Sequence, residues 1–299
     1  MPKSLPGPKD MPEGHPDLPT DLTIGLPVYN MEAYVEEAVQ SLLSQTYSNF
    51  RLVISDNAST DGTTEILARL AQQDTRITLI EQFENKGIAA NFRAVLDACQ
   101  TPYFMWAAAD DVWQDNWIER LLPIAKRQDT IAFGQTQDVD QSLRKRSHPA
   151  NGRDLSFSGP RLIRRLRYFL SPGLLGRANP IYGIFRKELL DEAAWAEFAS
   201  GKLYGDVLLL YVMLRRAEII CDPGGVIYKR RHPKSAAVSG GPQKAKRRFR
   251  KTHLPDIWRL SSWDERVGLI LLYPVAAIRA FAAKLAYLKG RALSRGRTY

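Results

Sequence analysis

Residues 22–30, LTIGLPVYN, decide the fold of this 299-residue chain. The apolar run over residues 22–26 ends at Pro27, which predicts a short buried strand. Residues 32–45 follow with apolar positions on one face of a helix, and Asn30 is a residue type that caps helix N-termini. A strand that leads directly into a helix predicts the start of a βαβ unit, so the polar residues between them lie at the carboxyl end of a strand.

The same alternation continues along the first half of the chain. Strands are predicted over residues 50–55, 76–80, 102–107 and 130–135, and helices over residues 61–72, 88–99 and 115–127. Strands that alternate with helices of about 10–15 residues predict an α/β fold with a mostly parallel sheet and helices on both faces. Such sheets bind ligands at the carboxyl ends of their strands, so the residues that follow each strand form the candidate site.

The second half of the chain is less regular. Residues 138–178 are polar and rich in arginine, which predicts a loop-and-helix insertion. A strand is predicted over residues 180–186 and a helix over residues 204–216. Residues 219–231 predict one or two strands, broken at the Pro-Gly-Gly sequence of residues 223–225.

Composition divides the chain into three parts. A hydrophobic content of 44% is enough for a packed core, and two cysteines exclude both a disulfide framework and a four-cysteine zinc site. Residues 1–20 are rich in proline and lack the apolar stretch of a secretory signal, which predicts a disordered leader and a cytoplasmic protein. We expect the main domain over residues 21–238 and a basic, amphipathic helical extension over residues 239–299.

The net charge of +10 is concentrated in the C-terminal quarter. Residues 229–299 contain 18 lysines and arginines against 3 acidic residues. The uncharged run over residues 267–278 is shorter than the about 20 residues of a membrane span. We therefore expect a helix in the membrane interface, with residues 244–291 in peripheral contact with the inner face of the plasma membrane. The alternative is a helix that packs on the domain.

The predicted insertion carries several basic residues between Arg144 and Arg167. We expect them to contact something anionic, either a lipid diphosphate acceptor or the membrane surface. A solvated face that contacts nothing would have the same composition. Nucleic acid is not an expected partner, because no aromatic stacking motif accompanies the basic runs.

Two adjacent carboxylates, Asp110 and Asp111, follow the apolar strand predicted over residues 102–107. Ionised carboxylates repel each other, so a site that keeps both ionised usually holds a cation. Oxygen ligands suit Mg²⁺ or Mn²⁺, which commonly take phosphate oxygens as further ligands. The alternative is that one carboxylate caps the helix that begins near Asp115.

A second polar cluster follows the strand predicted over residues 50–55. The carboxylate of Asp56 can accept hydrogen bonds from a nucleobase edge or a ribose hydroxyl, and Asn57 lies beside it. An Asx-turn in which Asp61 caps the next helix is compatible with that role. The sequence therefore predicts nucleotide contacts and turn contacts at the same strand end.

Four motifs resemble, in order and spacing, the donor-binding half of the family 2 glycosyltransferases, which have the GT-A fold. They are Pro27-Val28-Tyr29-Asn30, residues 55–63 (SDNASTDGT), Asn85-x-Gly87-x-x-x-Asn91 and Ala109-Asp110-Asp111. The resemblance continues more loosely through residues 179–186, 205–206 and 228–232, so it covers about residues 22–238. Four motifs in register are more specific than any one of them.

The resemblance implies a nucleotide-sugar site at these motifs. The residues that it places around the nucleotide are Pro27, Tyr29, Asn30, Asp56, Asn57, Lys86, Gly87 and Asn91. Among them, Asp56 would bind the base, which is usually uracil in the family. Lys86, Gly87 and Asn91 would lie near the diphosphate or the ribose.

The resemblance also implies a divalent cation, Mg²⁺ or Mn²⁺. Asp110 is similar to the metal ligand of the family, with Asp111 beside it. His232 and Arg231 follow a predicted strand and would approach the metal and the diphosphate, respectively. Ala108 departs from the family, whose Asp-x-Asp motif begins with an acid, and so removes a carboxylate that is expected to contact the ribose.

The acceptor hydroxyl needs a general base opposite the leaving group. Asp206 matches an acidic position of the family and opens a predicted helix, although it could serve only as an N-cap. In-line attack would invert the anomeric carbon.

We thus predict sugar transfer from a nucleotide-diphosphate sugar, expected to be a UDP-sugar, to a saccharide or lipid-linked acceptor, as in cell-surface glycan synthesis. The alternative, favoured by Ala108, is a non-catalytic module that binds a membrane or polyanion through its basic tail.

Overall fold

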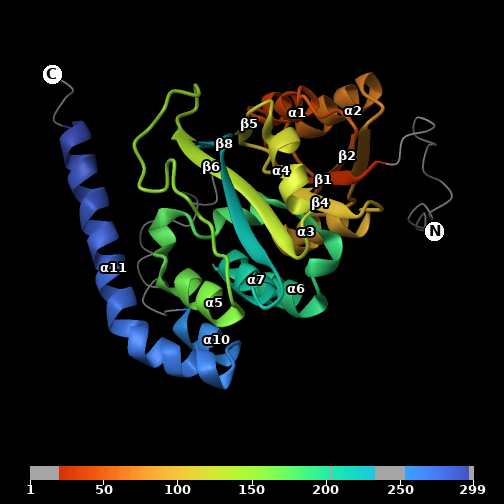
Figure 1. The fold of residues 1–299 in the computed structure, drawn as a ribbon. Helices are drawn as coiled ribbons and strands as arrows, with labels where there is room; N and C mark the ends of the chain where they lie inside the picture. Colours follow the sequence, from red (N-terminus) through yellow and green to blue (C-terminus); the bar gives the residue numbers. More distant parts are fainter. Residues whose placement is uncertain (1–19, 203, 233–252, 296–299) are drawn as a thin grey trace.

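The computed structural model of the chain describes residues 20–202, 204–232 and 253–295. Residues 1–19 of the predicted leader and the basic residues 244–251 lie outside the described residues. The described part forms one sheet surrounded by helices, and a long C-terminal helix runs along one side of the molecule (Figure 1).

The sheet contains eight strands in the order β3-β2-β1-β4-β7-β6-β8-β5. The strands are β1 (Leu22–Val28), β2 (Phe50–Asp56), β3 (Ile77–Glu81), β4 (Tyr103–Trp106), β5 (Val112–Trp113), β6 (Thr130–Val139), β7 (Ile184–Arg186) and β8 (Glu218–Arg230). Strands β3, β2, β1 and β4 are parallel, as are β6 and β8, whereas β7 and β5 pair antiparallel with their neighbours. The predicted α/β class with a mixed, mostly parallel sheet is confirmed.

Helices connect these strands and cover the sheet. They are α1 (Val35–Leu43), α2 (Thr63–Gln73), α3 (Gly87–Asp97), α4 (Trp117–Ala125), α5 (Arg161–Leu170), α6 (Glu192–Ala199), α7 (Gly205–Met213), α10 (Leu254–Arg259) and α11 (Trp263–Arg295). Short 3-10 helices are η1 (Gly173–Leu175), η2 (Asn179–Tyr182) and η3 (Lys187–Leu189). The alternation predicted for the first half of the chain is confirmed, with helix bounds that differ by a few residues.

Strand β1 lies in the middle of the parallel part of the sheet and is buried along its whole length. A Cβ atom at Gly25 would lie 2.7 Å from both Phe104 and Val95, so only glycine lets β4 and α3 pack this closely. The register pairs Val28 with Asp56. The carboxyl ends of β1 and β2 therefore meet at one edge of the sheet, where the candidate site lies.

Two predictions for the second half are wrong in detail. Residues 180–186 are not one strand, because Asn179–Tyr182 form η2 and only Ile184–Arg186 pair in the sheet. Pro180 has no N–H to donate to a ladder and suits the first turn of a helix instead. The break predicted at residues 223–225 is absent: β8 runs through it, with a register shift on the partner strand near Gly134.

The prediction that the basic residues between Arg144 and Arg167 contact an anion is wrong for two of them. Arg164 and Arg165 were expected to contact an anion, but their side chains are buried in the protein. Arg164 donates to the carbonyls of Leu214 and Arg215. Arg165 forms an ion pair with Glu265 in which the two side chains are 1% and 0% exposed. These arginines join α5 to the rest of the domain, because buried guanidinium groups need such partners.

Helix α11 is one continuous helix, with Pro274 in its interior. Its first turns pack on α5 and η1, where Glu265 and Leu269 are fully buried. By length and composition alone, Trp263–Leu288 is also apolar enough to cross a membrane, and only 6% of that window is buried in the protein.

Candidate active site

The turn after β2 is built on the Asp56 carboxylate. Oδ1 accepts hydrogen bonds from the backbone N–H of Ser59 at 3.1 Å and from its hydroxyl at 2.5 Å. Oδ2 accepts from the hydroxyl of Thr64 at 2.5 Å. Asp61 closes an Asx-turn to the backbone of Thr63, as predicted. Since Asp56 is 2% exposed, it fixes the shape of the turn, and its role in binding a base stays a prediction.

Asn30 holds the turn after β1 against the turn after β2. Its Oδ1 atom accepts a hydrogen bond from the Thr60 N–H at 2.7 Å, and its own N–H donates to the Ser59 hydroxyl at 2.9 Å. The N-cap role predicted for Asn30 is wrong, because α1 begins only at Val35. Asn30 instead adopts a left-handed φ of 53°, which asparagine tolerates better than most residues.

The loop before α3 is tied to the end of β2 by Asn57. Its Oδ1 atom accepts from the Lys86 N–H at 2.9 Å, and its Nδ2 atom donates to the Asn85 side chain at 2.9 Å. Gly87 begins α3 with a φ of 84°, which favours glycine. Tyr29 is 40% exposed and Lys86 is also exposed, so both side chains are available to a ligand.

Asn91 is buried behind this loop. Its Nδ2 atom donates to the Val28 carbonyl at 3.0 Å, and its Oδ1 atom accepts from the Gln82 side chain at 3.0 Å. Pro27 is also buried, within β1. Both residues therefore shape the predicted nucleotide pocket from behind, and ligand contact by either of them stays a prediction.

Asp110 meets His232 across the site. Nε2 of His232 lies 2.9 Å from Oδ2 of Asp110, although 122 residues separate them in the sequence. The ring of Tyr34 lies 4.3 Å from the His232 ring, between centroids. The predicted pairing of a carboxylate and an imidazole at the strand ends is therefore present in the fold.

Asp111 points toward Lys229 instead. Its Oδ2 atom accepts from Nζ of Lys229 at 2.9 Å, and its Oδ1 atom accepts from the Arg230 N–H at 2.9 Å. Burial opposes the charge of Lys229, but the Asp111 carboxylate raises the pKa of the ammonium above its ordinary value. Both oxygens of Asp111 thus have partners within the protein, and metal ligation by Asp111 stays a prediction.

Tyr182 lies at the centre of the charged groups. The Lys229 ammonium lies 4.4 Å from the centre of its ring. Burial, together with nearby carboxylates, raises the pKa of Tyr182 to about 12. These carboxylates are Asp111, Asp110 and Asp206. Tyr182 and Lys229 are both partly buried. They belong to the loosely matched segments 179–186 and 228–232, but the sequence analysis gave them no role.

Arg231 is paired with a second buried acid, Asp138. Its guanidinium donates to both oxygens of Asp138, at 2.6 and 3.1 Å. The neighbouring Arg230 pairs with Glu37 of α1 at 2.5 Å. A diphosphate would have to share Arg231 with Asp138, so the diphosphate contact stays a prediction.

Asp206 lies in the first turn of α7. Burial raises the pKa of Asp206 above its ordinary value, while the Val207 N–H and the charge of Arg177 act in the opposite direction. A carboxylate at a helix N-terminus would ordinarily be stabilised in its charged form, so burial dominates here. A raised pKa is typical of a group that takes up a proton during catalysis.

Helix α10 of the C-terminal extension holds the segment before Asp206. Asp256 accepts from Nζ of Lys202 at 2.5 Å and from the hydroxyl of Tyr204 at 3.0 Å. His253 contacts Arg177, and burial lowers the pKa of His253 to about 4. Arginine can only donate, so the neutral imidazole accepts this bond. Helix α10 therefore holds the segment that leads into Asp206, and no local motif indicated these contacts.

Asp110 and His232 provide two atoms that could hold a divalent cation. Their separation of 2.9 Å is close to that of neighbouring ligand atoms around an ion bound at about 2.1 Å. Within residues 20–202, 204–232 and 253–295, no group of three or more His, Cys, Asp or Glu could hold a metal ion. The divalent cation implied by the resemblance therefore stays a prediction, for which Asp110 and His232 are the candidate ligands.

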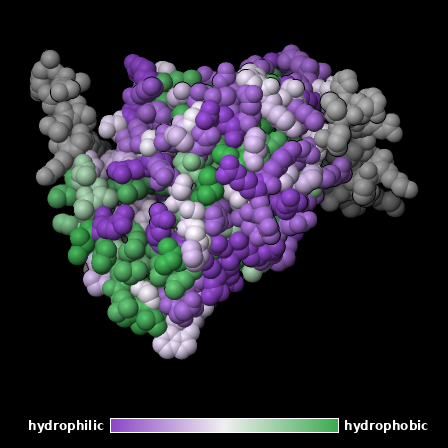
Figure 2. Space-filling view, viewed as in Figure 1, coloured by the Kyte–Doolittle hydropathy of each residue, from purple (hydrophilic) through white to green (hydrophobic). Residues whose placement is uncertain are grey.

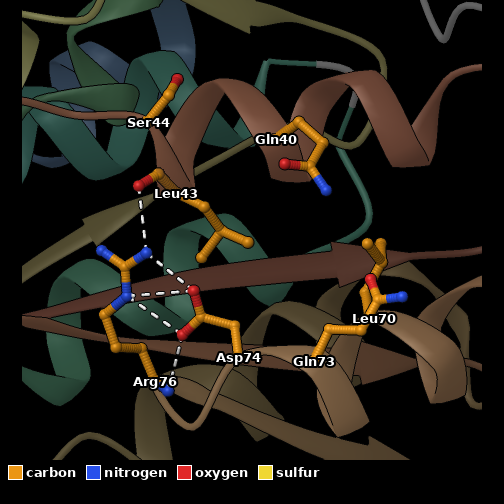
Figure 3. A pocket seen from close by; sticks show the side chains of 7 residues that line it. All are labelled: Gln40, Leu43, Ser44, Leu70, Gln73, Asp74 and Arg76. Carbon is orange, nitrogen blue, oxygen red and sulfur yellow. Dashed lines mark hydrogen bonds and ion pairs between the residues drawn. The ribbon is translucent and has the colours of Figure 1, made fainter.

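A hollow of about 330 Å³ lies elsewhere, between α1 and α2 (Figure 3). The guanidinium of Arg76 lies in it, but it donates to Asp74 and to the Leu43 carbonyl. Its charged groups already pair with each other, so we assign no chemistry to this hollow.

These strand ends, turns and acids lie at one edge of an α/β sheet. The chain belongs to glycosyl transferase family 2, whose family model matches residues 23–193. The chain is therefore a glycosyltransferase, as its sequence motifs predicted.

Two relatives of this chain are also named glycosyltransferases. The chain is 25% identical over 217 residues to the glycosyltransferase GlyG of Streptococcus pneumoniae, which covers 70% of this chain and 71% of GlyG. It is 34% identical over 96 residues to the putative teichuronic acid biosynthesis glycosyltransferase TuaG of Bacillus subtilis, which covers 32% of this chain and 38% of TuaG. The chain thus spans most of GlyG but less than half of TuaG.

Solved structures of S. aureus TarS 1–349 share the fold. The complex with UDP-GlcNAc matches with a TM-score of 0.55 and 18% identity, over 74% of this chain and 61% of TarS 1–349. The complex with UDP matches with a TM-score of 0.54 and 16% identity, over 93% of this chain and 92% of that one. At this level of identity the likeness shows the GT-A fold, which was predicted.

Proposed function

We propose that the chain transfers a sugar from a UDP-sugar to a hydroxyl of a saccharide or lipid-linked acceptor, with inversion at the anomeric carbon. The observation that carries this proposal is the contact between Asp110 and His232 at the strand ends, with the ion pair of Lys229 and Asp111 beside it. The TarS structures contain UDP-GlcNAc or UDP, and TuaG is named for teichuronic acid biosynthesis. Both observations support a nucleotide-sugar donor and a polysaccharide product.

In the proposed mechanism, the donor binds at the strand ends of β1, β2 and β4. Tyr29 and Lys86 are exposed at this edge and would contact the nucleotide. Asp110 and His232 would hold a Mg²⁺ or Mn²⁺ ion, which neutralises the negative charge of the departing diphosphate. Lys229 stays charged beside Asp111 and adds a fixed positive potential to the same region.

Asp206 would act on the acceptor. Its carboxylate accepts the proton of the acceptor hydroxyl as that oxygen attacks the anomeric carbon and the bond to the diphosphate breaks. The raised pKa of Asp206 makes it a stronger base than an ordinary aspartate. Attack from the side opposite the diphosphate inverts the configuration in one displacement.

A panel of nucleotide sugars, tested by thermal shift with and without Mn²⁺, examines the donor half of the proposal. Binding to the folded state raises the unfolding temperature, so a UDP-sugar should stabilise the wild-type protein more with Mn²⁺ than without it. Asp110→Ala should lose this difference, whereas Asp115→Asn, at an exposed acid nearby, should keep it. Equal stabilisation of wild type and Asp110→Ala would contradict the proposed ion site.

The non-catalytic module that Ala108 suggested is not favoured. A binding module has no need for a partly buried, charged Lys229 or for an acid such as Asp206, whose burial raises its pKa. Buried charges cost folding free energy, and sites retain them where they perform chemistry.

A further inference from the structure

Helix α11 has an outer stripe of apolar side chains that the domain does not cover. Its members follow each other at alternating steps of four and three residues, which places them on one face of a helix. They are Val267, Leu271, Pro274, Ile278, Phe281, Leu285 and Leu288. Leu271, Ile278 and Phe281 are 71%, 67% and 68% exposed. Figure 2 shows hydrophobic side chains gathered along the edge of the molecule where α11 runs in Figure 1.

The opposite face of α11 packs on the domain. Glu265 forms its buried ion pair with Arg165, and Gly268 lies against Leu166 of α5. Near the other end, the ring of Tyr287 lies 5.8 Å from that of His148. The helix therefore contacts the domain near both ends, and its outer stripe faces away from these contacts.

Charged residues flank the outer stripe. Between residues 266 and 288 the helix carries Arg266, Arg279 and Lys284 and no acidic residue. Helical spacing places Arg279 and Lys284 on the two sides of the stripe, and both are exposed. At the start of the helix, Trp263 is 75% exposed, and tryptophan favours the boundary between lipid and water.

We propose that the outer stripe of α11 lies flat on an anionic lipid surface. The stripe would enter the acyl boundary while the flanking basic groups contact anionic headgroups. A second copy of the chain fits less well, because pairing of two stripes would bring like-charged flanks together. A span fits less well too, since it would place Arg279 and Lys284 in hydrocarbon and detach α11 from α5.

Flotation of the full chain with lipid vesicles tests this proposal. We expect the wild type to float with vesicles of phosphatidylcholine and phosphatidylglycerol, and much less with phosphatidylcholine alone. The double variant Ile278→Gln/Phe281→Gln should bind at least about tenfold more weakly, because it removes buried apolar area from the lipid. The control Ala280→Gln/Ala286→Gln adds the same groups at exposed positions outside the stripe and should bind within about twofold of wild type.

A second double variant tests the contribution of the flanking basic residues to vesicle binding. Arg279→Gln/Lys284→Gln should lower binding to the anionic vesicles by about tenfold or more, with little change on phosphatidylcholine alone. Circular dichroism checks that each variant keeps its helices. Because these residues are exposed and lie outside the active site, sugar transfer in the absence of vesicles should not change, so this test is separate from that of the proposed function.

Three outcomes would overturn the proposal. The first is a wild type that does not float with anionic vesicles, or stripe variants that float equally well. The second is a dimer by light scattering that Ile278→Gln/Phe281→Gln dissociates, which would assign the stripe to a second copy. The third is resistance to extraction by alkaline carbonate, which would indicate a helix that spans the bilayer.

Discussion

The two halves of the active site are built from different interactions. The donor half lies at the ends of β1, β2, β3 and β4 and includes Asp110. It is held by hydrogen bonds among short polar side chains such as Asn30, Asn57 and Asn91. The catalytic half is held by partly buried ions, such as the Lys229–Asp111 pair, which joins residues 118 positions apart. The donor half thus rests on neutral hydrogen bonds between segments 29 to 63 residues apart, whereas the catalytic half rests on charge pairs.

If the catalytic half performs the chemistry, Asp206→Asn should have the largest effect on activity. Loss of a general base lowers kcat by about 10²–10⁴-fold. The affinity for UDP should stay within about twofold, since Asp206 lies outside the donor half. Steady-state kinetics measure both effects, with Asp115→Asn as the matched control at an exposed acid. Near-normal kcat in Asp206→Asn would remove the proposed base.

A substitution in α10 should lower kcat and leave the KM for the donor unchanged. Asp256→Asn removes the ion pair to Lys202 and weakens the contact with Tyr204, and so loosens the segment before Asp206. Small misplacements of catalytic groups are costly, so we expect kcat to fall by about tenfold while KM for the donor is unchanged. Asp264→Asn, at an exposed acid of α11, is the control. A change in KM alone would mean that α10 does not position the base.

Substitutions in the donor half should lower the free energy of unfolding. Asn91→Ala removes two hydrogen bonds, one to the Val28 carbonyl and one from the Gln82 amide. At about 0.5–1.5 kcal/mol for each bond, this should lower the free energy of unfolding by about 1–3 kcal/mol. Gln72→Ala, on the exposed face of α2, should change it by less than about 0.5 kcal/mol. Urea denaturation measures both variants. Equal effects would show that Asn91 does not stabilise the donor half.

The smallest effect concerns the pH dependence of stability at Asp206. Its pKa is raised above the ordinary 3.8 in the folded state, so ionisation costs stability as the pH rises through the folded-state pKa. Asp206→Asn removes this cost and should raise the unfolding temperature at pH 7. The gain should disappear below about pH 3.8, where Asp206 is protonated in both states. A gain that persists at low pH would contradict burial as the cause.

The sequence predicted the donor half because its signals are local. The turn residues of 55–63 and the strand–helix alternation around Pro27 act within a few residues, so periodicity and turn chemistry reveal them. Even so, it assigned to a ligand several groups, such as Asp56 and Asn57, whose hydrogen bonds hold the donor half itself. Side chains that close a turn and side chains that bind a ligand are the same residue types.

Most of the catalytic half could not be predicted in this way. Asp206 was identified from its place at a predicted helix start together with the resemblance to a family. Lys229 lay in a matched segment but received no role, Arg177 was not singled out, and the helical extension was not expected to contact the segment before Asp206. Their contacts join distant segments, such as Asp256 with Lys202, which are 54 residues apart. For the same reason the burial of Arg165 was missed, because its partner Glu265 lies 100 residues away. A run of basic residues in a sequence does not show which of them are paired.

Calorimetric titration of UDP in the presence of Mn²⁺ tests most directly whether the donor half binds the nucleotide while Asp206 acts only in catalysis. The account predicts that Asp206→Asn binds UDP as wild type does, while Asp110→Ala loses the part of the affinity that depends on Mn²⁺. Weakened binding in Asp206→Asn, or full Mn²⁺-dependent binding in Asp110→Ala, would contradict it.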